Sequence, residues 1–135
     1  MITDDNEADM SEDTTTVLVV DDQAPFRAVA RTVVSMAPGF GVVGEAESGE
    51  EAVRMAAELA PQVVLMDINL PGINGIEATR RIVAASPETV VILLSTYGRN
   101  DLPAEASTCG AATYVHKEDF EPGVLSDLWN GHHPT

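Results

Sequence analysis

The sequence predicts an α/β domain in which helices cover both faces of a parallel β-sheet. Four apolar segments of strand length, residues 17–20, 63–66, 90–94 and 111–115, alternate with segments whose apolar residues recur at helical spacing. These strands are apolar at consecutive positions, which is typical of strands buried on both faces. A fifth, less apolar strand is expected at residues 41–45, so that strand and helix alternate five times.

Start and stop signals delimit the first two helices. The first is expected to cover about 24–37, because Pro38 and Gly39 together end a helix. Ser48 and Glu51 form the capping-box pattern that opens the second helix. In both cases the boundary follows from local backbone chemistry and not from the apolar pattern alone.

Three more helices complete the alternation. One is expected from about 75 to 86. A second has the apolar residues Leu102, Ala106 and Cys109 on one side and ends at Gly110. A final short helix is lined by Phe120, Val124 and Leu128. The single cysteine is interpreted as a small core residue.

The chain is strongly acidic, with a formal net charge of −15. Residues 1–16 hold six of the 22 acidic residues and no base. Residues 1–15 are therefore expected to be a disordered tail, with Met10 as an alternative start, followed by one domain at 16–130 and a frayed C-terminus at 131–135. Because the domain is acidic too, direct binding of nucleic acid is not expected.

Composition excludes other classes of protein. No apolar run approaches the roughly 20 residues that span a bilayer, and the acidic N-terminus does not resemble a secretory signal. One cysteine excludes an intramolecular disulfide framework and fits a reducing compartment. We therefore expect a cytoplasmic protein that does not bind membranes. The three histidines, His116, His132 and His133, lack the spacing of metal ligands.

Polar residues follow four of the predicted strands. Asp21 and Asp22 come after the first strand, Asp67 after the third, Ser95 after the fourth, and Lys117, the only lysine, shortly after the fifth. In an open parallel sheet, ligands bind at the carboxyl ends of the strands. Each residue type also occurs in ordinary turns and helix caps, but their joint placement favours one crevice able to hold a divalent cation and a phosphoryl group.

These residues lie in segments that resemble the receiver domain of bacterial two-component response regulators. The resemblance covers about residues 16–129 and rests on VLVVDD at 17–22, VVLMDINLPGING at 63–75, Ser95, and YVHK at 114–117. It implies a single doubly wound five-stranded parallel sheet, the flavodoxin-like receiver fold, with strand order 2-1-3-4-5.

Two further segments are similar to NarL-type receivers, namely VVGEA at 42–46 and GIEATRR at 75–81. Receivers of that type usually precede a helix-turn-helix DNA-binding domain. The sequence has no such segment after the receiver, so a stand-alone receiver is expected.

The resemblance implies a chemical role for four residues. Asp67 would be the phosphoacceptor, whose carboxylate becomes an acyl phosphate. Lys117 would place its charge on the phosphoryl oxygens, and Ser95 would hydrogen-bond one of them once the phosphate is in place. Ser95 and Tyr114 would form the switch, in which the hydroxyl moves toward the phosphate and the aromatic ring turns inward behind it.

The resemblance also implies a metal site. Mg²⁺, or Mn²⁺, would be bound by Asp22, Asp67 and the backbone carbonyl of Asn69, with Asp21 acting through metal-bound water. The two residues that follow Ser95 also matter. Thr96 is larger than the small residue that receivers usually have there, and Tyr97 occupies a position that influences phosphate lifetime in the family. Both are expected to govern access to the phosphoryl site.

The expected function is that of a single-domain response regulator. It would accept a phosphoryl group on Asp67 from a histidine kinase or a phosphotransfer protein, in a Mg²⁺-dependent reaction, and switch a protein-binding surface. Such a protein is a signalling switch and not an enzyme, since it catalyses only its own phosphorylation and dephosphorylation. The downstream protein partner is unknown from the sequence, and a homodimer is one possible form.

Two alternatives stay open at this point. A degenerate receiver would use the same fold as a phosphorylation-independent interaction module, for which Thr96 is the best support. A dehalogenase-like phosphatase also has an aspartyl nucleophile at a strand end, but it carries a second Asp two residues later as general acid. Asn69 occupies that position and cannot act as a general acid.

Overall fold

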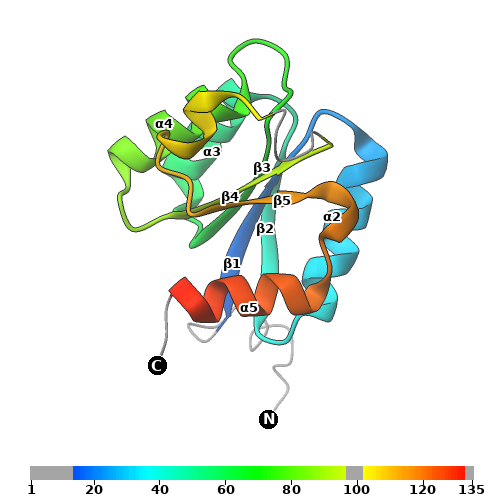
Figure 1. The fold of residues 1–135 in the computed structure, drawn as a ribbon. Helices are drawn as coiled ribbons and strands as arrows, with labels where there is room; N and C mark the ends of the chain where they lie inside the picture. The colour runs from blue at the N-terminus through cyan, green and yellow to red at the C-terminus, as the bar shows by residue number, and fades with distance from the viewer. Residues whose placement is uncertain (1–13, 97–101, 133–135) are drawn as a thin grey trace.

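The computed structural model describes residues 14–96 and 102–132, which form alternating strands and helices (Figure 1). The strands are β1 (Thr15–Val20), β2 (Phe40–Ala46), β3 (Val63–Asp67), β4 (Val90–Ser95) and β5 (Thr113–His116). The α-helices are α2 (Ala24–Met36), α3 (Gly49–Leu59), α4 (Gly75–Ala85) and α5 (Pro122–His132). Two short 3-10 helices, η2 (Ala104–Ser107) and η3 (Lys117–Asp119), flank β5.

The five strands form one parallel sheet in the order β2-β1-β3-β4-β5, which confirms the predicted doubly wound topology. Because every pairing is parallel, the carboxyl ends of all five strands lie along the same edge of the sheet. From β1 the chain first adds β2 on one side and then β3 on the other, so the topological switch point lies between the adjacent strands β1 and β3. Folds of this kind bind ligands at the switch point.

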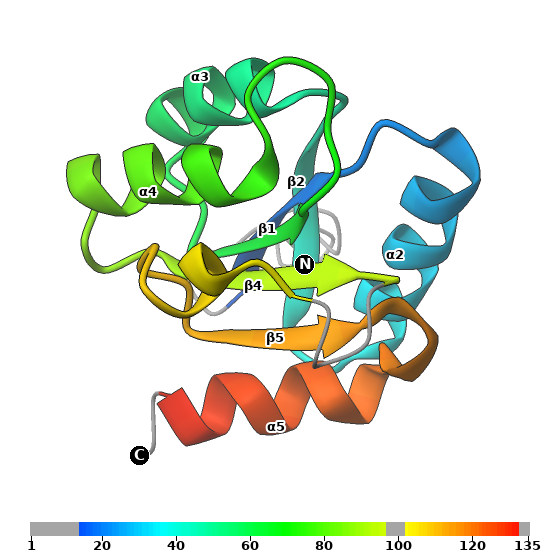
Figure 2. The ribbon, with the colours of Figure 1, turned by 45° about the horizontal axis from the view of Figure 1, so that its top comes forward.

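Helices cover both faces of the sheet, as predicted (Figure 2). Alternate residues of the central strands pack into two separate cores. Val17 and Val19 of β1 pack into the core that includes residues of α2 and α5, whereas Leu18 and Val20 pack into the core that includes residues of α3 and α4. All four residues are at most 1% exposed, which explains why the strand is apolar at consecutive positions.

Local hydrogen bonds set the start of two helices. The Oγ of Ser48 accepts the Glu51 N–H at 3.1 Å, as the capping-box pattern predicts. The Glu51 carboxylate accepts the N–H of Glu47, one residue before the cap, at 2.7 Å. At the start of α4, Asn74 Oδ1 accepts the Glu77 N–H at 2.9 Å. These caps thus fix where α3 and α4 begin.

The helix predicted around residues 102–109 is wrong in type, since the described part of this segment contains only the 3-10 helix η2. The hydroxyls of Ser107 and Thr108 donate to the carbonyls of Ala104 and Glu105, at 3.0 and 3.4 Å. Such side-chain bonds compete with the i→i−4 ladder of an α-helix. The core position predicted for Cys109 is nevertheless confirmed, because its side chain is buried.

β5 begins and ends later than predicted, so that His116 is its last residue and Lys117 opens η3. Gly110, just before the strand, has φ +103°, a backbone conformation that is not extended.

None of the helices in residues 14–96 and 102–132 is long and apolar enough to cross a bilayer. The predicted tail and frayed C-terminus lie mostly outside the described residues.

Candidate functional site

Three carboxylates converge at the switch point, as the strand-end pattern predicts. Asp21 and Asp22 follow β1, and Asp67 ends β3. One carboxylate oxygen from each lies within 4.8 Å of the others. Asp21 is 1% and Asp67 5% exposed, whereas Asp22 is exposed to solvent. Close carboxylate oxygens with one open side form a donor set suited to a hard divalent cation.

The ammonium group of Lys117 lies inside this cluster. Its Nζ donates to Asp21 Oδ2 at 2.7 Å and lies 3.5 Å from Asp67 Oδ1. It also lies 4.5 Å from the centroid of the Phe26 ring, a cation–π contact from the first turn of α2. The Lys117 ammonium therefore offsets part of the negative charge of Asp21 and Asp67, and a bound metal ion would offset more of the charge of the cluster.

The carboxyl group of Asp67 is electrostatically strained. Its burial, and secondly the charge of Asp21, raise its pKa from 3.8 to about 6. The Lys117 ammonium and the N–H of Asn69, which donates to Asp67 Oδ1 at 3.4 Å, partly oppose that rise in pKa. Since a carboxylate is the nucleophilic form, positive charge brought next to Asp67 would favour its reactive state.

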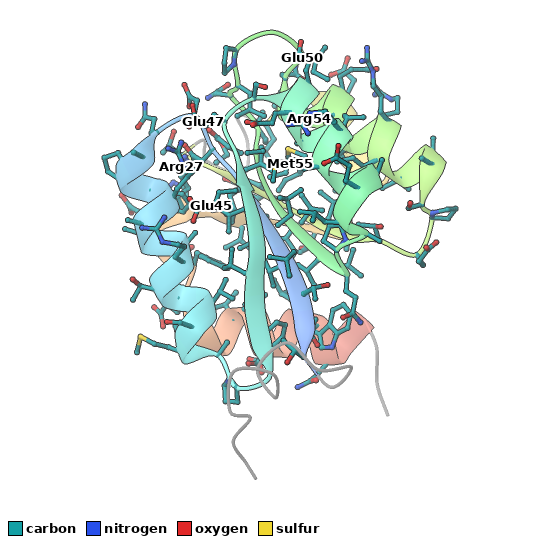
Figure 3. All side chains as sticks on the ribbon, turned by 180° about the vertical axis from the view of Figure 1, so that it is seen from behind. Arg27, Glu45, Glu47, Glu50, Arg54 and Met55 are labelled. Carbon is teal, nitrogen blue, oxygen red and sulfur yellow. The ribbon has the colours of Figure 1, made fainter. Side chains whose placement is uncertain are left out.

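Arg27 holds the loop that carries Asp21, a role that the sequence analysis missed. Its Nη1 donates to the backbone carbonyl of Asp21 at 2.8 Å. The same guanidinium lies 3.5 Å from carboxylate oxygens of Glu45 and Glu47, at the end of β2 and just beyond it (Figure 3). The Gln23 N–H donates to Asp21 Oδ1 at 2.8 Å. An arginine shortly after the two aspartates was the signal in the sequence that could have indicated this role.

The loop from β3 to α4 packs tightly beneath Asp67. Gly75 donates its N–H to the Ile68 carbonyl at 2.8 Å, and a Cβ at residue 75 would overlap the Asp67 carbonyl group. Farther along the loop, the Glu50 carboxylate of α3 accepts the Ile73 N–H at 3.1 Å. The glycine therefore allows the backbone of Asp67 to lie directly against the start of α4.

Ser95 ends β4 beside the cluster. It is 1% exposed and follows Leu94, which pairs with Asp67 in the sheet. Thr96 comes next, and its side chain is exposed. Tyr97, which was predicted to influence phosphate access, lies outside the described residues. Ser95 therefore lies at the same edge of the sheet as the carboxyl ends of β1 and β3, as predicted.

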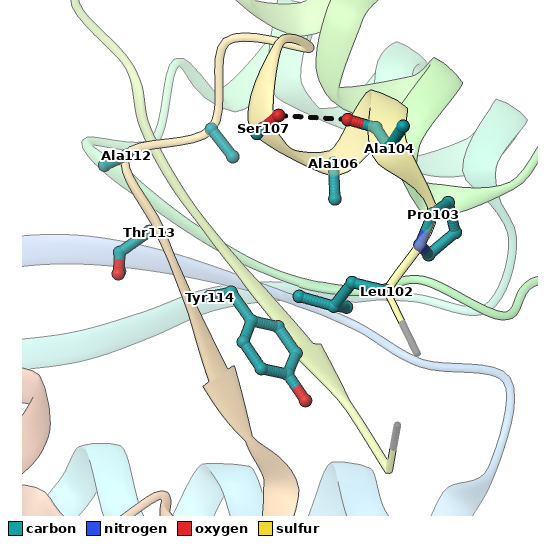
Figure 4. Close-up of a pocket in the computed structure, with 9 residues that line it drawn as sticks. Leu102, Pro103, Ala104, Ala106, Ser107, Ala112, Thr113 and Tyr114 are labelled. Carbon is teal, nitrogen blue, oxygen red and sulfur yellow. Dashed lines mark hydrogen bonds between the residues drawn. The ribbon is translucent and has the colours of Figure 1, made fainter. Parts of the chain in front are cut away.

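Tyr114 is the second residue of β5. Its partly buried ring lines a pocket of about 430 Å³ between η2 and β5, opposite Leu102 (Figure 4). Ala106 of η2 lines the same pocket. The predicted switch tyrosine therefore lines a surface pocket, and it precedes Lys117 by three residues in the sequence.

The family model for the response regulator receiver domain matches residues 17–128. The chain belongs to this family. Over 112 residues it is 44% identical to the response regulator UvrY of Escherichia coli, covering 83% of this chain and 51% of UvrY. It is 42% identical over 101 residues to the response regulator GacA of Pseudomonas protegens, covering 75% of this chain and 47% of GacA. The chain thus spans about half the length of these relatives.

Solved receiver structures have the same fold. A LuxR-family two-component response regulator from Aurantimonas superposes with a TM-score of 0.79 at 32% identity, covering 88% of this chain and 84% of that one. The response regulator domain of Thermotoga maritima CheB gives a TM-score of 0.77 at 35% identity, covering 87% and 95%. The receiver fold and membership of the response regulator receiver family are therefore established for this chain.

Proposed function

We propose that this receiver accepts a phosphoryl group on Asp67 from a histidine kinase or a phosphotransfer protein, in a Mg²⁺-dependent reaction. The observation that carries the proposal is the position of Asp67: it is buried at the end of β3, 3.5 Å from Lys117 Nζ, within the carboxylate cluster. A carboxylate oxygen of Asp67 attacks phosphorus, and the bond from phosphorus to the donor nitrogen or oxygen breaks.

The residues present fit a magnesium ion. Asp22, Asp67 and the backbone carbonyl of Asn69 would hold it, with Asp21 acting through metal-bound water. When bound, Mg²⁺ offsets the negative charge of the carboxylates and of the incoming phosphoryl group. The exposed Asp22 is the carboxylate that solvent reaches most readily. The three oxygens within 4.8 Å support this assignment, since in water-poor surroundings they repel one another.

Lys117 and Ser95 recognise the phosphoryl oxygens in this proposal. The ammonium group already lies beside Asp67, where it attracts a dianion as a point charge. The Ser95 hydroxyl donates to a phosphoryl oxygen after transfer. The new charge then favours one of two arrangements of Ser95 at the end of β4, with Tyr114 as its partner on β5. The pocket lined by Tyr114 belongs to the surface that changes.

Intact-mass spectrometry after incubation with acetyl phosphate and Mg²⁺ tests the proposal. We expect the mass of the wild type to increase by one phosphoryl group per chain. The mass of Asp67→Asn should not increase, and neither should that of the wild type when EDTA removes the metal. Asp127→Asn, on the exposed side of α5, is the matched control and should be modified like the wild type. A gain that persists in Asp67→Asn would place the phosphoryl group elsewhere and contradict the proposal.

This experiment and three related measurements separate the alternatives. A degenerate receiver takes up no phosphoryl group, yet binds its partner equally well with or without the phosphoryl donor. A phosphatase would instead turn over a generic phosphomonoester continuously, and the absence of a second carboxylate at Asn69 argues against this. Light scattering of the chain with and without phosphoryl donor tests whether the output is self-association or binding to a different protein.

A further inference from the structure

His116 connects two segments that border the site. It is the last residue of β5, paired in the sheet with Ser95 of β4, and it directly precedes Lys117. Its Nε2 lies 3.1 Å from the carbonyl oxygen of Thr96, just beyond β4. Its Nδ1 accepts the N–H of Glu118 in η3 at 3.2 Å. One imidazole therefore links the segment after β4 to the turn after β5.

The partners of the ring fix its tautomer. A backbone carbonyl such as that of Thr96 only accepts hydrogen bonds, so Nε2 must carry a proton. A backbone N–H such as that of Glu118 only donates, so Nδ1 must be unprotonated. Both bonds are made together only by the neutral ring with its proton on Nε2. The geometry thus specifies a state of His116 that can be observed directly.

The second of these bonds is a cap on the turn that carries Lys117. η3 begins at Lys117, and the His116 side chain accepts the N–H of Glu118, the second residue of this short helix. The lysine side chain has four rotatable bonds, so the place of its ammonium group depends on where this turn is held. The bond from Nε2 to Thr96 holds the turn against the strand that carries Ser95.

We propose that His116 is a positioning residue for Lys117, holding η3 against the end of β4 so that the ammonium group stays beside Asp21 and Asp67. Its part in phosphoryl transfer rests on the proposed function, but its effect on Lys117 does not. The Phe26 ring, 4.5 Å from Nζ, contacts the ammonium group from α2 and reports its position independently of any phosphorylation.

Nuclear magnetic resonance gives a direct readout, because Lys117 is the only lysine and its ε-methylene signal is unambiguous. In the wild type we expect this signal to be shifted upfield by the Phe26 ring current, and the His116 nitrogens to show a protonated Nε2. Phe26→Leu removes the ring and defines the unshifted position. In His116→Leu the lysine signal should move most of the way to that position.

Two milder variants separate the bonds. His116→Asn keeps an acceptor near the Nδ1 position, and His116→Gln carries an amide near the Nε2 position, so each should give a lysine shift between those of the wild type and His116→Leu. Glu118→Gln is the matched control, because it changes an exposed side chain of the turn and leaves the N–H that His116 accepts. It should leave the lysine signal unchanged.

Phosphorylation by acetyl phosphate is measured on the same variants. At saturating acetyl phosphate, His116→Leu should react at least tenfold more slowly, while its thermal unfolding shows that it is folded. An unchanged Lys117 signal in folded His116→Leu, or in both milder variants if His116→Leu does not fold, overturns the inference whatever the rate. A wild type that takes up no phosphoryl group contradicts the proposed function, and the lysine signal still decides the inference.

Discussion

Replacing Asp67 by Asn should stabilise the metal-free receiver. In the folded protein burial and the charge of Asp21 raise the pKa of Asp67 from 3.8 to about 6. The folded state therefore binds this proton more tightly than the unfolded state. Stability from this group is complete below about pH 4 and is lost as pH rises through about 6. Asp67→Asn removes the titration, so its advantage should grow with pH.

The magnitude follows from the shift in pKa. At about 1.4 kcal/mol per unit, the charged form of Asp67 costs the folded state about 3 kcal/mol near pH 7.5. Near pH 5, where the folded-state group is mostly protonated, the cost falls to about 1.5 kcal/mol. Both figures already include the attraction of Asp67 to Lys117, because that attraction lowers the pKa of Asp67, and we expect the difference of about 1.5 kcal/mol between them to be measurable.

Urea unfolding in EDTA at the two pH values, followed by far-ultraviolet circular dichroism, measures this difference. Both values lie above the isoelectric point of about 4.2. Asp127→Asn makes the same chemical change on the exposed side of α5 and should match the wild type at both pH values. If Asp67→Asn is no more stable than Asp127→Asn, or if its advantage is independent of pH, then the electrostatic strain assigned to Asp67 is absent.

Three other substitutions test how the site is built. Arg27→Met should weaken Mg²⁺ binding about tenfold in calorimetry, because it removes the donor to the Asp21 carbonyl. Arg31→Met, which removes an ion pair with Glu45, should have little effect on Mg²⁺ binding, and equal losses in the two variants would contradict the positioning role of Arg27. Gly75→Ala should lower unfolding stability by more than about 2 kcal/mol, since its Cβ would overlap the strand backbone; helix propensity alone predicts the opposite sign. Thr79→Val should raise stability by about 1 kcal/mol in urea unfolding, because the buried Thr79 hydroxyl has no hydrogen-bond partner in the described structure, and a loss of stability would refute this reading.

The sequence predicted the fold and the carboxylate cluster well because both depend on local signals. Consecutive apolar residues mark strands buried on two faces, and parallel pairing then brings Asp21 and Asp67 to one edge of the sheet. The capping box at Ser48 is also a local feature, and it placed the start of α3 correctly.

The errors and omissions have physical causes beyond the local pattern. The segment around 102–109 has a helical apolar spacing, but its hydroxyl side chains bond to nearby carbonyls and only a 3-10 helix forms in the described part. Arg27 and His116 act through backbone atoms of residues brought near by folding. A bond to a backbone carbonyl places no requirement on the partner's side chain, so no residue pair in the sequence signals it.

Locating the phosphoryl group on the chain tests the central claim most directly. After incubation with acetyl phosphate and Mg²⁺, borohydride reduction converts an aspartyl phosphate into homoserine, which peptide mass spectrometry assigns to a residue. We predict homoserine at residue 67 and at no other aspartate, with Asp67→Asn giving none. Homoserine at Asp21 or Asp22, or a phosphoryl group found on His116, would contradict the account of this site.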